Sequence, residues 1–504
     1  MNYADNLARG NGFVYYAGGE RVEGFTSFLW TVIVAGGVLV FGAQVNIAVV
    51  AISAVLGVLG LYCALRLAAI AAAATGAPRG VTLGAVSLIL LAAPGFFFWQ
   101  SFTMMETPLW TALFLLLVLR LAEPPARAID PVLVLAAFCL PLTRPEGIAF
   151  TIGLVALSVV LAPGRWRSGA AASLAALVAF GGLVAFRLSY FGFPFPNTYY
   201  AKVSADRIES IKEGIKYVQS FVVGLPFAEI LLVASAVLTA WAVLRRLGGA
   251  RGTDALLFIG AGAFGVFASY AMLGGDHFLF WRLIQPVLPL LAIAPALLVA
   301  LAWGPLRARL GLDGAPLGTA LVAAAAAGTW LAVGTLDYRS DRFAVDRYFG
   351  LVEQGLDFGR LMEERAPGTV IGVGPAGAIA LTYEGPIRDL LALNWVEMAH
   401  ETPVKTGLVG HGSFNREVFW RHPPDMLAEF NRPCDRDAWT WAFSVTNAVT
   451  FKGLYLEPEF HEAYTPVRIA DGDRCWRAFV TDAWLAAHDG PDIEKVDWSA
   501  VRLF

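Results

Sequence analysis

Ionisable side chains are sparse in the first two thirds of this chain, and most of the unusual ones gather in five short segments. These are residues 1–24, 104–108, 143–147, 194–202 and 274–282. Such groups are costly in apolar surroundings, so they often mark a site. Carboxylates can act as general bases, whereas arginine and lysine can hold an anion such as phosphate. The five segments therefore outline a candidate site for an anionic substrate.

The first segment, from Asn6 to Gly24, is polar and glycine-rich and runs directly into the hydrophobic stretch that begins at Phe25. This pattern is typical of the second half of an active-site loop. Its charged candidates for substrate binding are Glu20, Arg21 and Glu23.

Glu106 stands immediately before Thr107 and Pro108, which have the types expected of an N-cap and a first-turn proline. A helix that starts there holds the Glu106 carboxylate at its positive end and lowers the pKa of that group. Such a carboxylate suits a site where the charge is kept. The alternative is a solvated acid at a helix start, and the spacing does not separate the two.

Arg144 and Glu146 flank Pro145 at a turn between two short apolar segments. The simpler interpretation is a local ion pair at the membrane surface. The other is a phosphate clamp, because a guanidinium presents several donors in a fixed fork. The sequence leaves both open.

The fourth segment contains Asn197, Tyr199 and Lys202, and an amphipathic pattern follows it. Apolar residues recur at helical spacing, with charged residues opposite, which predicts a helix in the membrane interface that covers the membrane surface. The apolar positions are Ile208, Ile211, Ile215, Val218 and Val222. Tyr199 and Lys202 are better placed to meet the head of a lipid-linked substrate.

In the fifth segment, Gly274 and Gly275 permit a tight turn that directs Asp276, His277 and Arg282 toward a central cavity. Asp276 and His277 could ligate a divalent cation, but the pattern supplies no third ligand. A loop capped by a hydrogen bond from the backbone to Asp276 is the alternative. No cofactor is assigned.

The elements that must position these residues are membrane helices. The chain has 504 residues, of which 57% are hydrophobic and 15% charged, with a mean hydropathy of +0.61, which excludes an ordinary soluble protein. A span needs about 20 apolar residues. The candidates are 25–41, 45–65, 81–98, 107–121, 129–142, 147–161, 170–190, 225–244, 255–273, 283–303 and 317–334, about 10–11 helices. The segments near residue 130 are short, which indicates tilted, broken or protein-covered helices.

Charge divides the chain into three regions. Residues 1–24 carry two basic and three acidic groups, residues 25–334 carry 18 and 11, and residues 335–504 carry 17 and 26. We therefore expect a loop remnant (1–24), a transmembrane domain (25–336) and a water-soluble domain (337–504). The acidic last region excludes a nucleic-acid partner.

Arginine placement predicts the orientation in the lipid bilayer. Arg165 with Arg167, the group around Arg245, and Arg307 with Arg309 mark three loops that we expect in the cytoplasm. The alternate loops and the C-terminal domain then lie outside. For residues 1–24 to lie outside as well, one stretch between residues 25 and 80 must not cross fully.

Two further patterns concern the C-terminal region. Cys434 and Cys475 could pair in an oxidising compartment or remain two buried thiols. The run from Gly372 to Gly377 has the spacing of a dinucleotide-binding motif, but we interpret it as a strand-to-helix turn in a small α/β domain.

Taken in order, these segments resemble the terminal arabinofuranosyltransferases of the actinobacterial cell wall and their broader bacterial relatives. That family belongs to the GT-C superfamily of polyprenyl-phosphate-sugar-dependent glycosyltransferases. The resemblance covers nearly the whole chain, and it is looser in the C-terminal domain, around 377–380 and 389–390. The matching segments are Asn6 to Gly10, Gly19 to Trp30, Glu106 to Pro108, Arg144 to Gly147, Pro196 to Lys202, and Gly274 to Asp276 with Arg282.

The resemblance implies a multi-pass α-helical membrane protein with a GT-C type transmembrane bundle and a C-terminal soluble α/β domain. It implies inverting transfer of a sugar from a polyprenyl-phosphate donor to a cell-envelope glycan or lipid acceptor, outside a bacterial cytoplasmic membrane. Glu106 matches the acid of the family's second outer loop and is the candidate catalytic base. Lys202, Arg144 and Arg282 are implied to bind phosphate, and Asp276 or His277 to contact the sugar; the further candidates for substrate binding are Asn197, Tyr199, Glu20, Arg21 and Glu23.

The chain departs from the family pattern before Tyr3, where the family places an acidic pair on a loop that follows a first membrane helix. Neither is present, and Asp5 is not a substitute for the pair. We therefore expect a start that has been shortened, and an inactive chain as given. The alternatives are a transporter or lipid-carrier flippase, although no internal repeat is visible, and a non-catalytic GT-C homologue.

Overall fold

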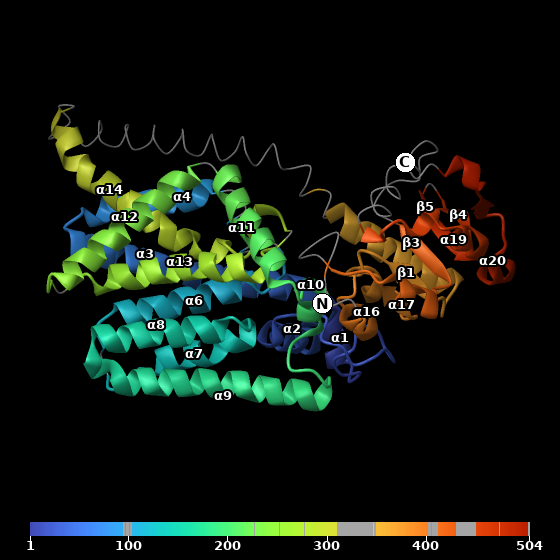
Figure 1. Cartoon of the computed structure of the whole chain (residues 1–504), viewed down its shortest axis with the longest axis horizontal. Coiled ribbons are helices and arrows are strands. Elements are labelled where there is room, and N and C mark those ends of the chain that lie inside the picture. The colour runs from blue at the N-terminus through green and yellow to red at the C-terminus, as the bar shows by residue number, and fades with distance from the viewer. Residues whose placement is uncertain are drawn as a thin grey trace.

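The computed structural model describes residues 1–93, 96, 100, 103–125, 127–225, 227–250, 252–276, 278–309, 346, 349–401, 405, 412–429, 450–472 and 474–501. A helical bundle forms one part and a smaller domain with a β-sheet the other, and the N-terminal segment lies between them (Figure 1). The expected boundary at residue 336 and the expected helix at 317–334 lie outside the described residues.

The apolar runs form helices close to the predicted ranges. The bundle consists of α2 (Phe28–Phe41), α3 (Val45–Thr75), α4 (Arg79–Ala92), α6 (Thr107–Ala122), α7 (Pro131–Thr143), α8 (Gly147–Leu161), α9 (Trp166–Tyr190), α12 (Ala228–Leu247), α13 (Asp254–Leu273) and α14 (Leu288–Arg309). Among the described residues, five stretches are long and apolar enough to cross a membrane, and α2 with α3 counts as one of them.

The short helix α6 runs through the middle of the bundle. Twelve of its 16 residues are buried, including Trp110, Phe114 and Val118. A helix that is covered by protein on most sides does not need the length that lipid would require. Burial therefore explains the shortness of α6, which is one of the short apolar segments near residue 130.

Polar side chains fix where several helices begin. The Ser27 side chain accepts a hydrogen bond from the backbone N–H of Trp30 at the start of α2. Asp130 accepts from Val132 and Leu133 at the start of α7. These caps satisfy backbone donors that have no partner inside a helix.

The arginine-rich loops lie at the end of the bundle that is remote from the β-sheet domain (Figure 1). Arg165 donates to the carbonyls of Leu121 and Glu123 at the end of α6. Arg246 donates to Leu161 at the end of α8 and pairs with Asp254 at the start of α13. These contacts bring the loops around Arg165 and Arg246 together at one end of the bundle. This is the arrangement expected for loops that are separated by two membrane crossings.

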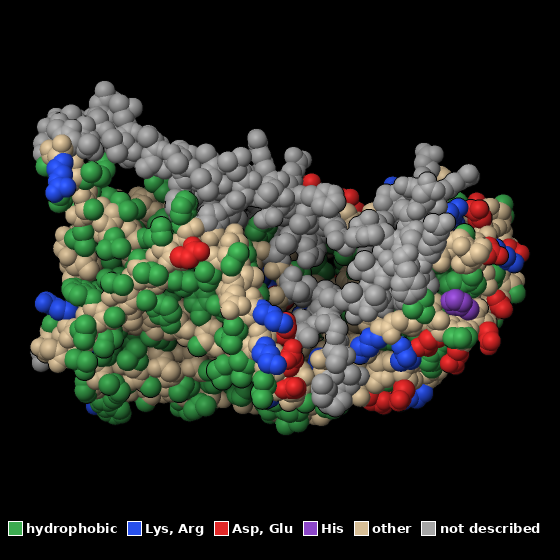
Figure 2. Space-filling model, turned by 45° about the horizontal axis from the view of Figure 1, so that its top comes forward, with side chains coloured by type: hydrophobic (Ala, Val, Ile, Leu, Met, Phe, Trp, Pro, Cys, Tyr) green, Lys and Arg blue, Asp and Glu red, His purple; other side chains and the backbone are tan. Residues whose placement is uncertain are grey.

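Two further helices cover the end of the bundle that faces the sheet domain. They are α10 (Asn197–Lys202) and the amphipathic α11 (Arg207–Gly224). Hydrophobic side chains cover the flank of the bundle, and charged side chains gather near its junction with the sheet domain (Figure 2).

The C-terminal domain contains a six-stranded mixed sheet of order β2-β1-β3-β5-β4-β6. Strand β1 is parallel to β2 and β3, and the remaining pairs are antiparallel. The strands are β1 (Ile371–Val373), β2 (Ile387–Asp389), β3 (Met426–Glu429), β4 (Tyr464–Asp471), β5 (Arg474–Thr481) and β6 (Ile493–Lys495). The helices are residues 349–365, α16 (Val396–His400), α17 (Arg416–Arg421), α19 (Pro458–Ala463) and α20 (Asp482–His488).

The glycine-rich run at residues 372–377 begins inside β1 and continues as a turn, and a short 3₁₀ helix (Ile379–Leu381) comes after it. Its carbonyls bind the N-terminal segment: Ala376 accepts from the Tyr15 hydroxyl and Gly377 from the Asn2 amide. The turn is thus part of an internal contact. Cys434 lies outside the described residues, so its pairing with Cys475 stays a prediction, while Cys63 and Cys139 are free.

The N-terminal segment begins with a helix, α1 (Asn2–Ala8), although the sequence predicts a loop. Tyr3, Tyr15 and Val22 belong to the hydrophobic core of the C-terminal domain. Residues 1–24 therefore complete that domain as well as lead into α2, a connection that no local pattern encodes.

Candidate functional site

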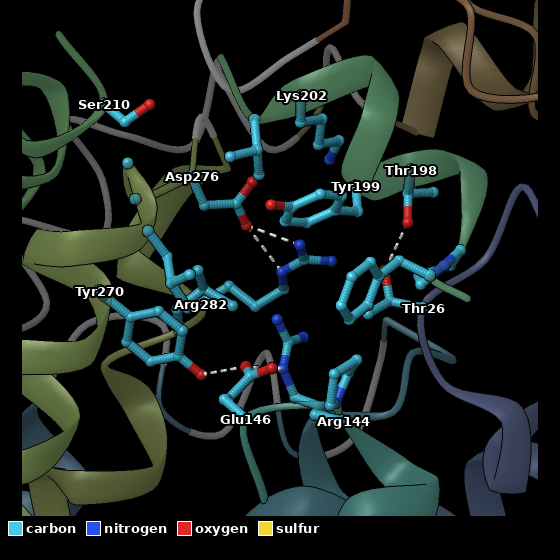
Figure 3. A pocket seen from close by; sticks show the side chains of 18 residues that line it. Thr26, Arg144, Glu146, Thr198, Tyr199, Lys202, Ser210, Tyr270, Asp276 and Arg282 are labelled. Atoms are coloured by element: carbon cyan, nitrogen blue, oxygen red, sulfur yellow. Dashed lines mark hydrogen bonds and ion pairs between the residues drawn. The ribbon is translucent and has the colours of Figure 1, made fainter. Parts of the chain in front are cut away.

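A cavity of about 280 Å³ lies at the end of the bundle beside α10 and α11. Three cations and two carboxylates from three different segments point into it (Figure 3). Its apolar wall includes Leu273 and Leu283. The charged lining residues are Arg144, Glu146, Lys202, Asp276 and Arg282.

Arg144 enters the cavity from the sharp turn between α7 and α8. Pro145 starts the turn, and Gly147 permits it, because a Cβ at residue 147 would lie 2.6 Å from the Leu140 carbonyl group. This close approach explains why residue 147 is a glycine.

Two carboxylates hold the Arg144 guanidinium. Its Nη1 lies 2.7 Å from Glu106 Oε1, and its Nε lies 2.6 Å from Glu146 Oε1. The Tyr270 hydroxyl also donates to Glu146 Oε1, at 3.0 Å. The guanidinium is therefore fixed on two sides, and the rest of the fork faces the cavity.

Burial and charge act in opposite directions on Glu146. Burial by itself raises the pKa of the Glu146 carboxyl, but the adjacent Arg144 guanidinium outweighs burial and holds that pKa below its ordinary value. Glu146 consequently stays ionised near neutral pH, which makes it a good partner for Arg144 and a weak proton acceptor.

Glu106 is the N-cap residue of α6, one position earlier than the sequence predicts, and its side chain lies behind Arg144. The carboxylate is nearly buried. Among the described residues that line the cavity, Arg144 is present and Glu106 is not. This placement suits a residue that positions Arg144.

Asp276 and Arg282 form a second ion pair on the opposite wall. Arg282 Nη2 and Nε lie 2.6 and 2.9 Å from Asp276 Oδ2. The turn before them needs its glycines: Gly275 has φ +73°, and a Cβ there would meet Tyr217 Cβ at 2.4 Å. The fifth segment is thus turned inward as expected, although His277 lies outside the described residues.

Lys202 is the third cation and sits at the last residue of α10, opposite the arginines (Figure 3). Within the described part of the chain it makes no hydrogen bond or ion pair. Burial lowers the pKa of its amino group, and Asp276 offsets part of that effect. A half-buried cation that is not committed to a carboxylate is the feature of this cavity most suited to an anionic ligand.

Tyr199 lines the same cavity, with its ring near the Arg282 guanidinium (Figure 3). Beside it the hydroxyls of Thr26 and Thr198 are 3.1 Å apart and close the side toward the N-terminal segment. Thr26 and Tyr270 have no sequence signal of their own, since neither stands out from its apolar surroundings.

The remaining predicted residues are placed elsewhere. The Asn197 amide donates to the carbonyls of Ala392, Leu393 and Trp395 and so ties α10 to the C-terminal domain. Glu20 accepts a hydrogen bond from the Val396 backbone, and Arg21 lies over the ring of Tyr190 at 4.8 Å.

Glu23 is buried in a bidentate ion pair with Arg187 of α9, with both distances 2.7 Å. Burial raises the pKa of the Glu23 carboxyl, and Arg187 opposes that shift. The pair anchors the N-terminal segment to the bundle. The sequence did not single out Arg187, because it lies inside an apolar run that reads as a span.

No group of three or more His, Cys, Asp or Glu side chains that could hold a metal ion occurs in the part of the chain that the structure describes. Among those residues, the carboxylates of the cavity face arginines. A role for a divalent cation stays an untested alternative.

Comparison with solved structures finds a similar fold. No family model and no curated protein matches the chain. The fold is similar to the crystal structure of ArnT from Cupriavidus metallidurans bound to undecaprenyl phosphate, with a TM-score of 0.54 and 15% identity over 95% of this chain and 92% of that chain. This likeness confirms the predicted fold: a multi-pass α-helical membrane protein with a GT-C type bundle and a C-terminal α/β domain.

Proposed function

We propose that this protein is a membrane glycosyltransferase that takes a sugar from a polyprenyl-phosphate donor and passes it to a cell-envelope glycan or lipid. The observation that carries the proposal is Lys202, an uncommitted cation that faces two fixed arginines, Arg144 and Arg282, across a cavity at the end of a GT-C type bundle. The likeness to a protein whose crystal structure contains undecaprenyl phosphate supports it.

In this proposal Lys202 binds the donor phosphate directly, and the two arginines orient it. The bond from the anomeric carbon to the phosphate oxygen breaks, and the phosphate leaves with the electron pair as an anion. Positive groups that are already in place lower the barrier to such a departure. The Arg144 and Arg282 guanidinium groups point into the same space as the Lys202 amino group (Figure 3).

The acceptor hydroxyl attacks the anomeric carbon from the opposite side, so the configuration is inverted, and its proton passes to a carboxylate. Of the two described carboxylates on the cavity wall, Asp276 is the candidate for this role, because Arg144 holds the pKa of Glu146 below its ordinary value. We assign Glu106 to holding Arg144, while its predicted role as the base is tested below.

The lipid part of the donor is proposed to run along the apolar side of the cavity toward the membrane. Leu273, Leu283 and Phe195 line that side. The adjacent helix α11 carries exposed Ile208, Ile211 and Ile215, which suits a helix at the membrane surface.

The proposal also includes the identity of the donor sugar and the side of the membrane on which the transfer takes place. The sequence resemblance makes arabinofuranose the first donor sugar to test. The positions of the arginine-rich loops support the part of the proposal that puts the cavity and the C-terminal domain outside a bacterial cytoplasmic membrane.

The proposal is tested by incubating the purified protein with a polyprenyl-phosphate arabinofuranose donor and envelope glycan fragments. Time-dependent release of polyprenyl phosphate together with a lengthened glycan is expected. A matched pair of variants controls the assay: Lys202→Gln should lose activity, whereas Lys212→Gln, on the exposed face of α11, should keep it. Donor binding without cleavage of the sugar–phosphate bond would instead indicate a lipid-carrier transporter or a non-catalytic homologue.

A further inference from the structure

A second cavity, of about 230 Å³, lies between the N-terminal segment and the C-terminal domain. The N-terminal segment contributes Tyr16 and Glu20. The C-terminal domain contributes Arg388, Trp395 and Glu397. None of these five residues lines the cavity described above.

Arg388 of β2 presents an unsatisfied buried donor in this second cavity. Its guanidinium lies over the Trp395 ring, 5.0 Å from the ring centroid. Among the described residues it makes no hydrogen bond, and its Nε is buried without an acceptor. A buried donor without a partner is unfavourable, so an oxygen-bearing ligand that accepts from Arg388 is stabilised there.

Two further polar groups remain open on the opposite wall. Glu20 uses Oε1 to accept from the Val396 N–H at 3.0 Å, which leaves Oε2 available. The Tyr16 hydroxyl has no hydrogen-bond partner among the described residues. Gly18, with φ +77°, lets the chain turn between these two side chains.

The charges of this cavity favour a neutral ligand. Glu20 and Glu397 oppose an anion, and Arg388 opposes a cation. Glu397 is also occupied by Arg421 and His422. What remains is a mixture of donors and acceptors beside aromatic rings, which matches the hydroxyls and the apolar face of a sugar ring.

The two cavities are close neighbours along the chain. Val22 lines the second cavity and Thr26 the first, and four residues span at most about 14 Å. In the chain, Asn197 lies between Pro196 and Thr198, which line the first cavity. Its amide donates to the carbonyl of Trp395, which lines the second cavity. One extended glycan could therefore occupy both.

We propose that the second cavity binds a neutral sugar residue of a glycan, at a distance from the site of transfer. That this glycan is the acceptor rests on the proposed function; the binding of a neutral saccharide does not. The volume suits a single sugar residue with its neighbours extending into solvent.

The test measures binding of the purified full-length protein, in detergent and without donor, to a panel of neutral oligosaccharides: arabinan, galactan and mannan fragments. At least one is expected to bind. Arg388→Gln should weaken that binding about 10- to 100-fold, in line with the loss of a hydrogen bond from a charged donor, and Tyr16→Phe should weaken it several-fold. Lys495→Gln, an exposed lysine on β6 of the same domain, is the matched control and should bind like the unmodified protein.

Failure of this inference is distinguishable from failure of the proposed function. If no neutral fragment binds, or if Arg388→Gln, Tyr16→Phe and Lys495→Gln all bind equally well, the inference is overturned even when polyprenyl phosphate is released. If saccharide binding depends on Arg388 but the protein releases no polyprenyl phosphate, the inference is supported and the proposed transferase function is contradicted. Tyr16→Phe deletes only a hydroxyl, so it tests the cavity even if Arg388→Gln does not fold.

Discussion

At the scale of single residues, the cavity contains two kinds of cation. Arg144 and Arg282 are each neutralised by carboxylates that fix their geometry. Lys202 has no such partner within the described residues. The fixed guanidinium groups can orient a bound phosphate, because their donors form a rigid fork. The free ammonium group contributes mainly its charge. The combination suits a phosphate that must bind, react and leave.

The first prediction concerns Glu106. If it acts by holding Arg144, Glu106→Gln should lower turnover about 10- to 100-fold, and combined with Arg144→Gln it should cost nothing beyond Arg144→Gln alone. A general base contributes about 10²- to 10⁴-fold by itself, so the double variant would then be clearly worse than Arg144→Gln. Initial rates of the four proteins decide between the two roles. Unchanged turnover of Glu106→Gln would remove Glu106 from the site altogether.

The second prediction is a pH dependence. Because burial lowers the pKa of Lys202, its amino group loses the proton at a lower pH than an exposed lysine does. Affinity for a polyprenyl phosphate should therefore fall as the pH rises through that lowered pKa, at a lower pH than for an exposed lysine. Lys202→Arg stays charged throughout and should show a flatter profile. Parallel loss of affinity in both proteins would assign the effect to another group.

At the scale of elements, turns and buried pairs decide where the polar residues point. The α7–α8 turn directs Arg144 inward because Gly147 tolerates the Leu140 carbonyl. The Gly274–Gly275 turn does the same for Asp276. Both placements were predictable from the sequence, since glycine and proline identify tight turns and loops at one end of a bundle converge.

Other placements were not predictable. Glu20 and Glu23 are separated by two residues, yet one faces the C-terminal domain and the other Arg187 of α9. The partner in each case is more than 160 residues away. Local spacing contains no information about such contacts, and the same limit applies to Tyr3, which donates to Asn394.

The third prediction tests the buried pair between Glu23 and Arg187. Both side chains are almost completely buried, so Arg187→Met alone leaves a charge without a partner and should destabilise the protein by about 3–5 kcal/mol. The double variant Glu23→Leu/Arg187→Met leaves no buried charge and should lose much less. Thermal unfolding in detergent measures both; equal losses would mean that the pair stabilises through contacts other than its charge.

At the scale of the whole molecule, the N-terminal segment joins the bundle to the C-terminal domain. Tyr3 and Tyr15 pack in the core of that domain, while residues beyond Phe28 form α2. Both cavities lie along this connection. The sequence predicted the overall fold, because apolar runs and the charge shift are strong signals, but not this contact between the two ends of the chain.

The fourth prediction is the orientation in the membrane. Gly248 follows α12 at the arginine-rich end, and Glu459 is exposed on α19 of the C-terminal domain. In intact cells, a membrane-impermeant maleimide should label Glu459→Cys, and it should label Gly248→Cys only after permeabilisation. The unmodified chain gives the background. The reverse pattern would place the cavity in the cytoplasm.

The central claim is that the phosphate of a polyprenyl carrier binds at Lys202, and it is tested most directly by the affinity of the purified protein for undecaprenyl phosphate. The account predicts that Lys202→Gln weakens this affinity about 10- to 100-fold, while Lys212→Gln, an exposed lysine paired with Glu209, leaves it unchanged. Equal affinity of the two variants would contradict the account.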